Sequence, residues 1–235
     1  MKSEKQQQTG FIERTPMKAI WLSHPLDTDT PLYGGDKGID IRPDKSMARG
    51  DSCNTTILKL PAHAGSHVDA PAHFIADGLT ITDYDAQAWI FDHPLVVEVP
   101  AAPGILLGPE NLERIQQGTT HTDLLLIRTG FEDRRGKPVY WQNAPGIAPE
   151  TADFLLARLP GLKAVGFDFI SISSLAHREA GRAAHRAFLG AGLRIFEDLS
   201  LSALESKKRL DRVIALPLRV SGADGAPCTV VGFLR

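Results

Sequence analysis

Short blocks of apolar residues recur along the chain between polar, Pro- and Gly-rich segments, and they predict a mixture of strands and helices. Four runs have the length and composition of strands: residues 18–23, 55–60, 94–99 and 123–128. Farther along, strand-like runs at 164–170 and 193–196 alternate with helix-like segments at 149–158 and 178–189, and 109–116 reads as a short helix. This alternation predicts an α/β domain with a sheet of mixed direction.

Turn-rich segments between these elements supply candidate binding residues. Residues 24–36 form a loop in which Tyr33 precedes two glycines, so Tyr33 is either a surface residue or part of a pocket wall. The charged, proline-containing segment 132–149 is predicted to be an irregular loop of a length that is often functional. Three aromatic residues at 81–92 belong either to the core or to an aromatic binding site: Tyr84, Trp89 and Phe91.

Residues 60–74 contain three of the eight histidines and one carboxylate, at positions of equal parity: His63, His67, Asp69 and His73. An extended backbone points such residues to one face, whereas a helix does not. A straight strand would hold His63 and His67 roughly 13 Å apart, too far to share an ion. The backbone must therefore turn between them, and Gly65 permits that turn because glycine adopts positive φ freely.

The residue types in this cluster indicate a metal site. Imidazole and carboxylate ligands without a nearby thiolate suit zinc, and less selectively manganese or iron. A single histidine is usually a solvated or hydrogen-bonded residue, so the prediction depends on four ligand-type residues standing together. In the second half, His185 lies on a predicted helix and Glu197 at the end of the next strand, where the two side chains could converge. His177 and Asp168 could be proposed with equal freedom.

Composition narrows the class of protein. With 235 residues, 43% of them hydrophobic, the chain can bury a core, and we expect a flexible arm over residues 1–16 and a single domain over 17–235. The net charge of -2 gives no reason to expect nucleic acid or an anionic membrane as a partner. Two cysteines, no run of about 20 apolar residues and no apolar leader predict a cytoplasmic protein.

The run from His63 to His73 resembles the signature of the metal-dependent cyclase-like hydrolase family, which includes bacterial kynurenine formamidase and isatin hydrolase. That signature is His-x-Gly-Thr-His-x-Asp-x-Pro-x-His, and only its Thr is changed here, to Ser66. Further similarity extends over most of the chain: residues 23–26, 30–36 and 128–130, and a His twelve residues before a Glu, which are His185 and Glu197.

The resemblance implies the swivelling β/β/α fold, with a mixed sheet, in a homodimer or larger assembly such as a homotetramer. It implies that His63 and His67 bind a first metal ion and His185 a second, that Asp69 and Glu197 bridge the ions, and that His73 transfers protons. Tyr33 stands where the formamidases have a substrate-contacting Trp, which makes Tyr33 a candidate substrate-binding residue. Some relatives use a single manganese, so one or two zinc ions or manganese are expected.

These ligands fit hydrolysis. A divalent ion lowers the pKa of a bound water from 15.7 towards about 7, and a histidine beside the ion can protonate the leaving group. We expect cleavage of the C–N amide bond of a small aromatic substrate, as in arylformamidases. Ring opening of an isatin-like cyclic amide or a lactone is the alternative. A metal-binding protein without turnover is disfavoured, because structural zinc sites usually close with four protein ligands, often cysteines.

Overall fold

The computed structural model describes residues 17–116, 121–204 and 209–235. The expected arm over residues 1–16 lies outside the described residues. None of the described helices is long and apolar enough to cross a membrane.

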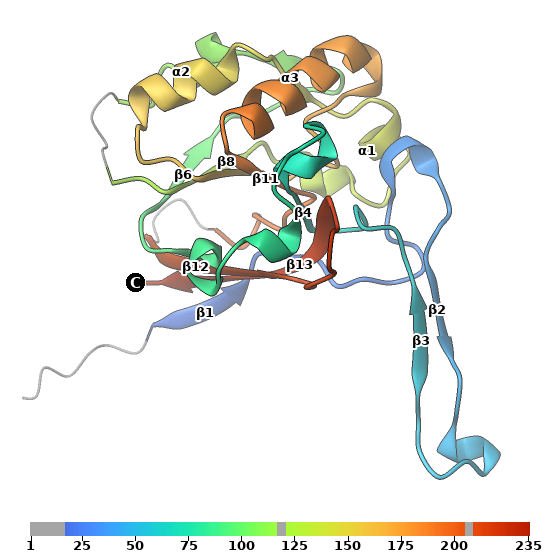
Figure 1. The fold of residues 1–235 in the computed structure, drawn as a ribbon. Coiled ribbons are helices and arrows are strands. Elements are labelled where there is room, and N and C mark those ends of the chain that lie inside the picture. Colours follow the sequence, from blue (N-terminus) through green and yellow to red (C-terminus); the bar gives the residue numbers. More distant parts are fainter. Residues whose placement is uncertain (1–16, 117–120, 205–208) are drawn as a thin grey trace, which may run out of the picture.

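A nine-stranded mixed sheet organises the molecule (Figure 1). Four of its strands are parallel: β6 (Pro94–Glu98), β8 (Leu124–Arg128), β10 (Ala164–Phe167) and β11 (Arg194–Glu197). Five are antiparallel: β4 (His67–Asp69), β13 (Gly225–Leu234), β12 (Leu210–Pro217), β5 (Ile90–Phe91) and β1 (Lys18–Trp21). The order is β5-β12-β13-β4-β11-β10-β8-β6, with β1 also on β13. Because β12 also contacts β6, the sheet nearly closes on itself.

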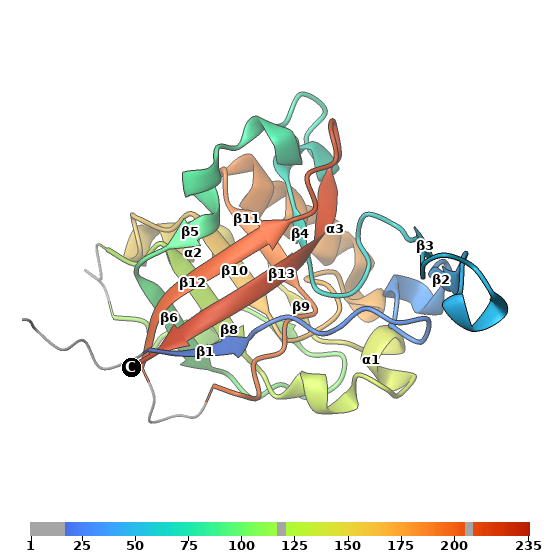
Figure 2. The same cartoon turned by 90° about the horizontal axis from the view of Figure 1, so that it is seen from below.

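Helices α2 (Thr151–Arg158) and α3 (Arg178–Gly190) cover the parallel strands on one side, whereas no described element covers β1, β12 and β13 on the other (Figures 1 and 2). The remaining elements are short: α1 (Val139–Gln142), a pair of strands β7 (Leu106–Leu107) and β9 (Gly146–Ile147), and 3-10 helices at Tyr33–Gly35, Met47–Arg49, Pro71–His73, Ile81–Asp83, Ala86–Trp89, Pro109–Leu112, Phe131–Arg134 and Leu175–His177.

The central parallel strands β8 and β10 are buried on both faces, which explains their nearly uninterrupted apolar sequences. In β8, Leu125 and Ile127 belong to the cluster under the helices, while Leu124 and Leu126 belong to a second cluster within the curved sheet. β4 sits between β11 and β13 at the junction of the two halves, so its side chains are held by strands on both sides.

A hairpin of β2 (Asp40–Pro43) and β3 (Thr56–Lys59) projects from the body. Every residue of β3 is exposed, and Figure 1 shows no other element beside the hairpin. The strand expected at 55–60 is therefore present, but it pairs in this arm and not in the main sheet.

The predicted α/β class and the mixed sheet are confirmed. The strand at 164–170 is shorter than expected and ends at Phe167. The helix expected at 109–116 is a single 3-10 helix over Pro109–Leu112, and the Asn111 side chain caps its start by accepting a hydrogen bond from Gly108 N (2.8 Å). The aromatic residues at 81–92 belong to the core: Trp89 and Phe91 are buried, and Tyr84 packs against them.

Candidate metal centre

Strand pairing aligns three of the expected ligands. In β4, His67 and Asp69 are two residues apart and so point to one face. Glu197 of β11 lies directly opposite His67 in the antiparallel ladder, which brings its carboxylate to the same face. His67, Asp69 and Glu197 are all buried, and ligand atoms of the three lie within 4.8 Å of one another. Gly65 has φ 62°, so the turn expected before His67 is confirmed.

His185 reaches this cluster from α3. Its Nε2 lies 3.5 Å from Asp69 Oδ2 and 3.6 Å from Glu197 Oε1. His67 Nε2 lies 3.4 Å from Asp69 Oδ1 and from Glu197 Oε2. The other ring nitrogens face backbone carbonyls, His67 Nδ1 on Gly65 O (2.8 Å) and His185 Nδ1 on Gly181 O (2.9 Å). With Nδ1 donating, each ring turns its Nε2 towards the two carboxylates, and Nε2 is then the atom available to a metal ion.

These distances fit an ion better than direct hydrogen bonds. Separations of 3.4–3.6 Å between ring nitrogens and carboxylate oxygens exceed the usual 2.7–3.2 Å of a hydrogen bond. A cation bound at about 2.0–2.2 Å from each atom would fit between them. In the described part of the chain, buried Asp69 Oδ2 also has no hydrogen-bond partner. The residues present therefore fit a divalent metal.

The pKa values of the buried histidines and carboxylates also favour a bound cation. Although burial favours the neutral ring, the adjoining carboxylates of Asp69 and Glu197 raise the pKa of His185 to about 10. Burial likewise opposes ionisation of Asp69, yet the histidines around it hold the pKa of that carboxyl well below its usual range. Protons on the rings balance the buried carboxylates in the protein alone, and a cation would replace them.

His63 and His73 stand at the edge of the cluster and share a partner that the sequence did not reveal. His63 Nδ1 contacts Asp69 Oδ1 at 2.8 Å, and its Nε2 contacts Asp224 Oδ2 at 3.0 Å. The same Oδ2 atom lies 2.9 Å from His73 Nδ1, and the two imidazole centroids are 4.0 Å apart. Asp224 thus fixes the orientation of both rings. Its only signal in the sequence is an acidic residue in a Gly-containing turn, which usually marks an exposed loop.

Close packing keeps these groups in place. A Cβ on Gly225 would overlap the His63 ring, and one on Gly181 would overlap Ser173. Glu197 Oε1 accepts hydrogen bonds from Ile172 N (2.7 Å) and Ser171 Oγ (3.1 Å). The carboxylate therefore has a fixed direction, since buried polar groups with two donors rarely rotate.

Ser66 stands where the resembled signature has Thr, and its hydroxyl makes two hydrogen bonds. Its Oγ accepts from His24 N at 2.8 Å and donates to Asp198 O. Asp198, with φ 52°, is clamped in turn by Arg135 Nη2 (2.8 Å) and by Tyr140 OH (2.5 Å). This network ties the early loop to the strand end that carries Glu197.

A cavity of about 430 Å³ opens onto the cluster. The predicted site residues on its wall are Tyr33, His63, His67, His73, His185 and Glu197, while Asp69 lies fully buried behind them. Phe74, Ile170 and Leu175 add apolar wall, and Arg178 and Arg182 add positive charge. All the residues singled out in the sequence as site candidates meet here. The two alternatives do not: Asp168 binds Thr129 N and Gly130 N, and His177 contacts Gly104 O.

Residues 20–174 match the family described as "Putative cyclase". The chain belongs to this family. The match includes the whole run from His63 to His73 and so confirms the resemblance seen in the sequence. This cyclase-family chain is 28% identical over 212 residues to a kynurenine formamidase of Bacillus thuringiensis (strain Al Hakam), covering 90% of this chain and 95% of that protein. It is 28% identical over 214 residues to a kynurenine formamidase of Bacillus anthracis, covering 91% and 96%.

Solved structures share the fold. Isatin hydrolase A from Labrenzia aggregata superposes with a TM-score of 0.76 at 24% identity, covering 92% of this chain and 93% of that one. A structure described as a potential metal-dependent hydrolase with cyclase activity gives a TM-score of 0.72 at 20% identity, covering 94% and 99%. The expected fold is therefore confirmed.

Proposed function

We propose that this chain is a metal-dependent hydrolase that cleaves the C–N amide bond of a small aromatic substrate, as an arylformamidase does. One observation carries the proposal: His67, His185, Asp69 and Glu197 converge at the floor of a cavity with nitrogen–oxygen distances of 3.4–3.6 Å. The relatives named kynurenine formamidase and isatin hydrolase support the same class of reaction.

Either one or two ions of zinc, or of manganese, suit this donor set. His63, through the Nδ1 that faces Asp69, and His67 would hold a first ion, and His185 a second, with Asp69 and Glu197 shared between them. A bound divalent ion supplies a water of lowered pKa and polarises the substrate carbonyl. Histidines and carboxylates around an open cavity differ from closed structural sites, which favours turnover over mere metal storage.

The chain's own residues supply the remaining steps. Phe74, Ile170 and Tyr33 offer apolar and aromatic surface for a flat ring beside the cluster. His73 lies at the cavity wall, with its Nδ1 held by Asp224, so that its Nε2 is left to exchange a proton with the reacting groups. Loss of the amine requires a proton at nitrogen, and a fixed imidazole is suited to deliver it.

The test is metal content together with hydrolysis. Zinc- or manganese-loaded protein should hydrolyse formanilide or formylkynurenine, and His67→Ala should lose most bound metal, because one of few ligands is gone. The exposed His93→Ala is the control and should keep both properties. If the metal-loaded wild-type protein cleaves only isatin or lactones, the ring-opening alternative is the correct function. Unchanged metal in His67→Ala would overturn the site.

We also propose that the protein is cytoplasmic and assembles as a homodimer or homotetramer. The projecting hairpin and the exposed apolar side chains on β1 and β12, Trp21 and Leu216, support assembly with a second copy.

A further inference from the structure

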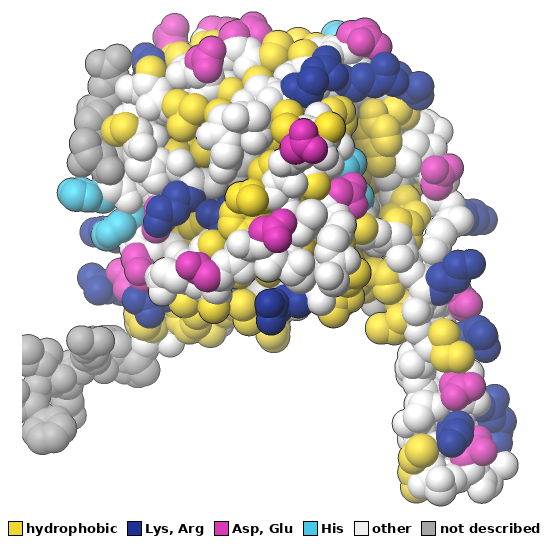
Figure 3. All heavy atoms as spheres, in the orientation of Figure 1, with side chains coloured by type: hydrophobic (Ala, Val, Ile, Leu, Met, Phe, Trp, Pro, Cys, Tyr) yellow, Lys and Arg dark blue, Asp and Glu magenta, His cyan; other side chains and the backbone are white. Residues whose placement is uncertain are grey.

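The N-terminal half of α3 places two arginines beside the metal centre. Arg178 and Arg182 are four residues apart, and His185 follows three residues later, so all three lie along one face of the helix. All three also line the cavity. Figure 3 shows Lys and Arg side chains gathered over this end of the molecule, next to hydrophobic surface.

Neither guanidinium is committed to a strong internal partner. Arg178 has no hydrogen bond or ion pair to any described residue. Arg182 Nη1 lies 2.8 Å from Glu179 Oε1, but both side chains are largely exposed, at 55% and 84%. Such exposed pairs contribute little and exchange readily. The N-terminus of α3 adds partial positive charge at the same place.

Tyr33 lines the same cavity as the two arginines, and the electrostatics of its hydroxyl agree with that placement. Burial raises the pKa of Tyr33, whereas the charges of Arg178 and Arg182 act to lower it. Both guanidinium groups are thus within electrostatic range of the residue that marks the substrate side of the cavity. Asp36 is the one described acidic residue on the cavity wall outside the metal cluster.

We propose that Arg178 and Arg182 form an anion subsite, and that the preferred substrate is an aromatic amide carrying a carboxylate. This inference rests on the proposed hydrolase function and names the class of substrate. The aromatic ring lies against Phe74, Ile170 and Leu175, the amide faces the metal centre, and the carboxylate meets the arginines. Guanidinium groups suit this task because their paired N–H donors match a carboxylate.

The test compares charged with neutral substrates. The three positional isomers of formamidobenzoate are assayed beside formanilide, with metal-loaded wild type, Arg178→Gln, Arg182→Gln and the double variant. Arg186→Gln is the matched control, since Arg186 is an exposed arginine of the same helix that does not line the cavity. Metal content is measured for every variant, because a carboxylate could also bind the ion.

We expect at least one formamidobenzoate to exceed formanilide in kcat/KM, and the double variant to lose that advantage by about tenfold, mainly through KM. Formanilide should change less than about twofold, because it carries no anionic group for the arginines to bind. Arg186→Gln should leave both substrates unchanged. A preference that persists in the double variant, or an equal fall for both substrates, would overturn the subsite.

Equilibrium binding separates failure of the subsite from failure of the proposed function. Calorimetric titration with benzoate and with benzamide should show benzoate binding that weakens in the double variant but not in Arg186→Gln. If no amide is hydrolysed but this pattern holds, the proposed reaction is wrong and the anion subsite stands. If amides are hydrolysed but benzoate binds wild type and the double variant equally well, the subsite is wrong.

Discussion

A single aspartate decides how two histidines of the signature can act. Asp224 Oδ2 lies within 3.0 Å of His63 Nε2 and of His73 Nδ1, and so fixes both rings. Ligand atoms of His63, Asp69 and His73 lie within 4.8 Å of one another, so this geometry allows His73 to bind an ion as well as to transfer a proton, and substitution of His73 separates the two roles.

His73→Ala should keep the metal and lose roughly 10²–10⁴ in turnover, the usual contribution of a general acid or base. Asp224→Asn should retain the shape of the site and lose less turnover than His73→Ala, chiefly in kcat. The reason is that His73 keeps a polar neighbour but not the charged one that fixes its tautomer. Elemental analysis and steady-state kinetics check both variants. Loss of metal from His73→Ala would make His73 a ligand.

Glu132 offers a prediction about pH. Burial, with the nearby charge of Asp168, raises the pKa of Glu132 from 4.5 to about 7. The folded state therefore binds this proton more tightly than the unfolded state, so the contribution favours folding below pH 4.5 and is lost as the pH rises through 7. Glu132→Gln should remove this decline between pH 5 and pH 8 in thermal unfolding, whereas the exposed Glu113→Gln should retain it.

At the scale of elements, a three-residue strand holds the centre together. β4 pairs with β11 on one side and β13 on the other, so Asp69 faces both Ile195 and Gly225. Short strands are weak alone, and pairing on both edges gives β4 its rigidity. Gly225, the first residue of β13, has no side chain and so leaves the space that the His63 ring occupies.

Gly225→Ala should therefore displace His63 and weaken metal binding, and overpacking of this kind typically costs about 1–3 kcal/mol of stability. Gly136→Ala is the control, because no atom lies within 4 Å of its added Cβ. Metal titration and thermal unfolding measure the two effects. Equal behaviour of the two variants would show that His63 can move away without consequence.

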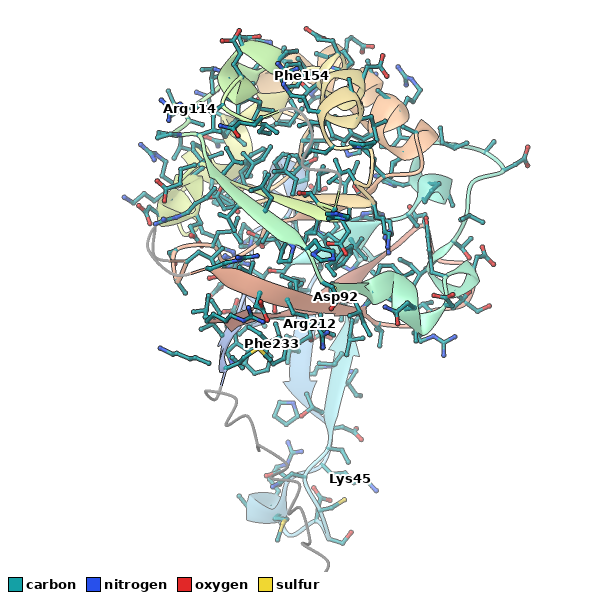
Figure 4. All side chains as sticks on the ribbon, turned by 90° about the vertical axis from the view of Figure 1, so that its left-hand side faces the viewer. Lys45, Asp92, Arg114, Phe154, Arg212 and Phe233 are labelled. Carbon is teal, nitrogen blue, oxygen red and sulfur yellow. The ribbon has the colours of Figure 1, made fainter. Side chains whose placement is uncertain are left out.

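At the scale of the molecule, one sheet face is apolar and uncovered. Alternation along β1, β12 and β13 directs Trp21, Ile214, Leu216, Val231 and Phe233 outward, and Trp21 and Leu216 are 67% and 57% exposed. Figure 2 looks onto these strands from below. Figure 4 shows Phe233 and Arg212 at the lower side of the body and the hairpin that carries Lys45 extending beyond it. Exposed apolar surface of this kind is typical of protein–protein interfaces.

We propose that a second copy of the chain covers this face, with the hairpin of each copy, which carries exposed Met47 and Leu58, lying along the other copy. Light scattering should give a mass that is a multiple of 25.5 kDa for wild type and a smaller mass for Leu216→Lys. Leu79→Lys is the control, since Leu79 is 51% exposed but belongs to none of these strands. A wild-type monomer would contradict the proposal.

Local sequence determined the α/β class, the turn at Gly65 and the ligand types of the signature, because periodicity and backbone freedom are properties of neighbouring residues. It also indicated His185 and Glu197, although only the resemblance distinguished them from His177 and Asp168. The C-terminal strands β12 and β13 were not predicted. Tertiary structure alone decided which side chains meet.

Asp224 lies 161 residues from His63 and Arg178 more than 100, and no local pattern encodes such separations. The sequence also predicted a strand at 55–60 but gave no sign that it pairs with β2 in a hairpin. Pairing of β4 with β11 and β13 brings these distant residues together, since each strand's register is set by burial of its own apolar face.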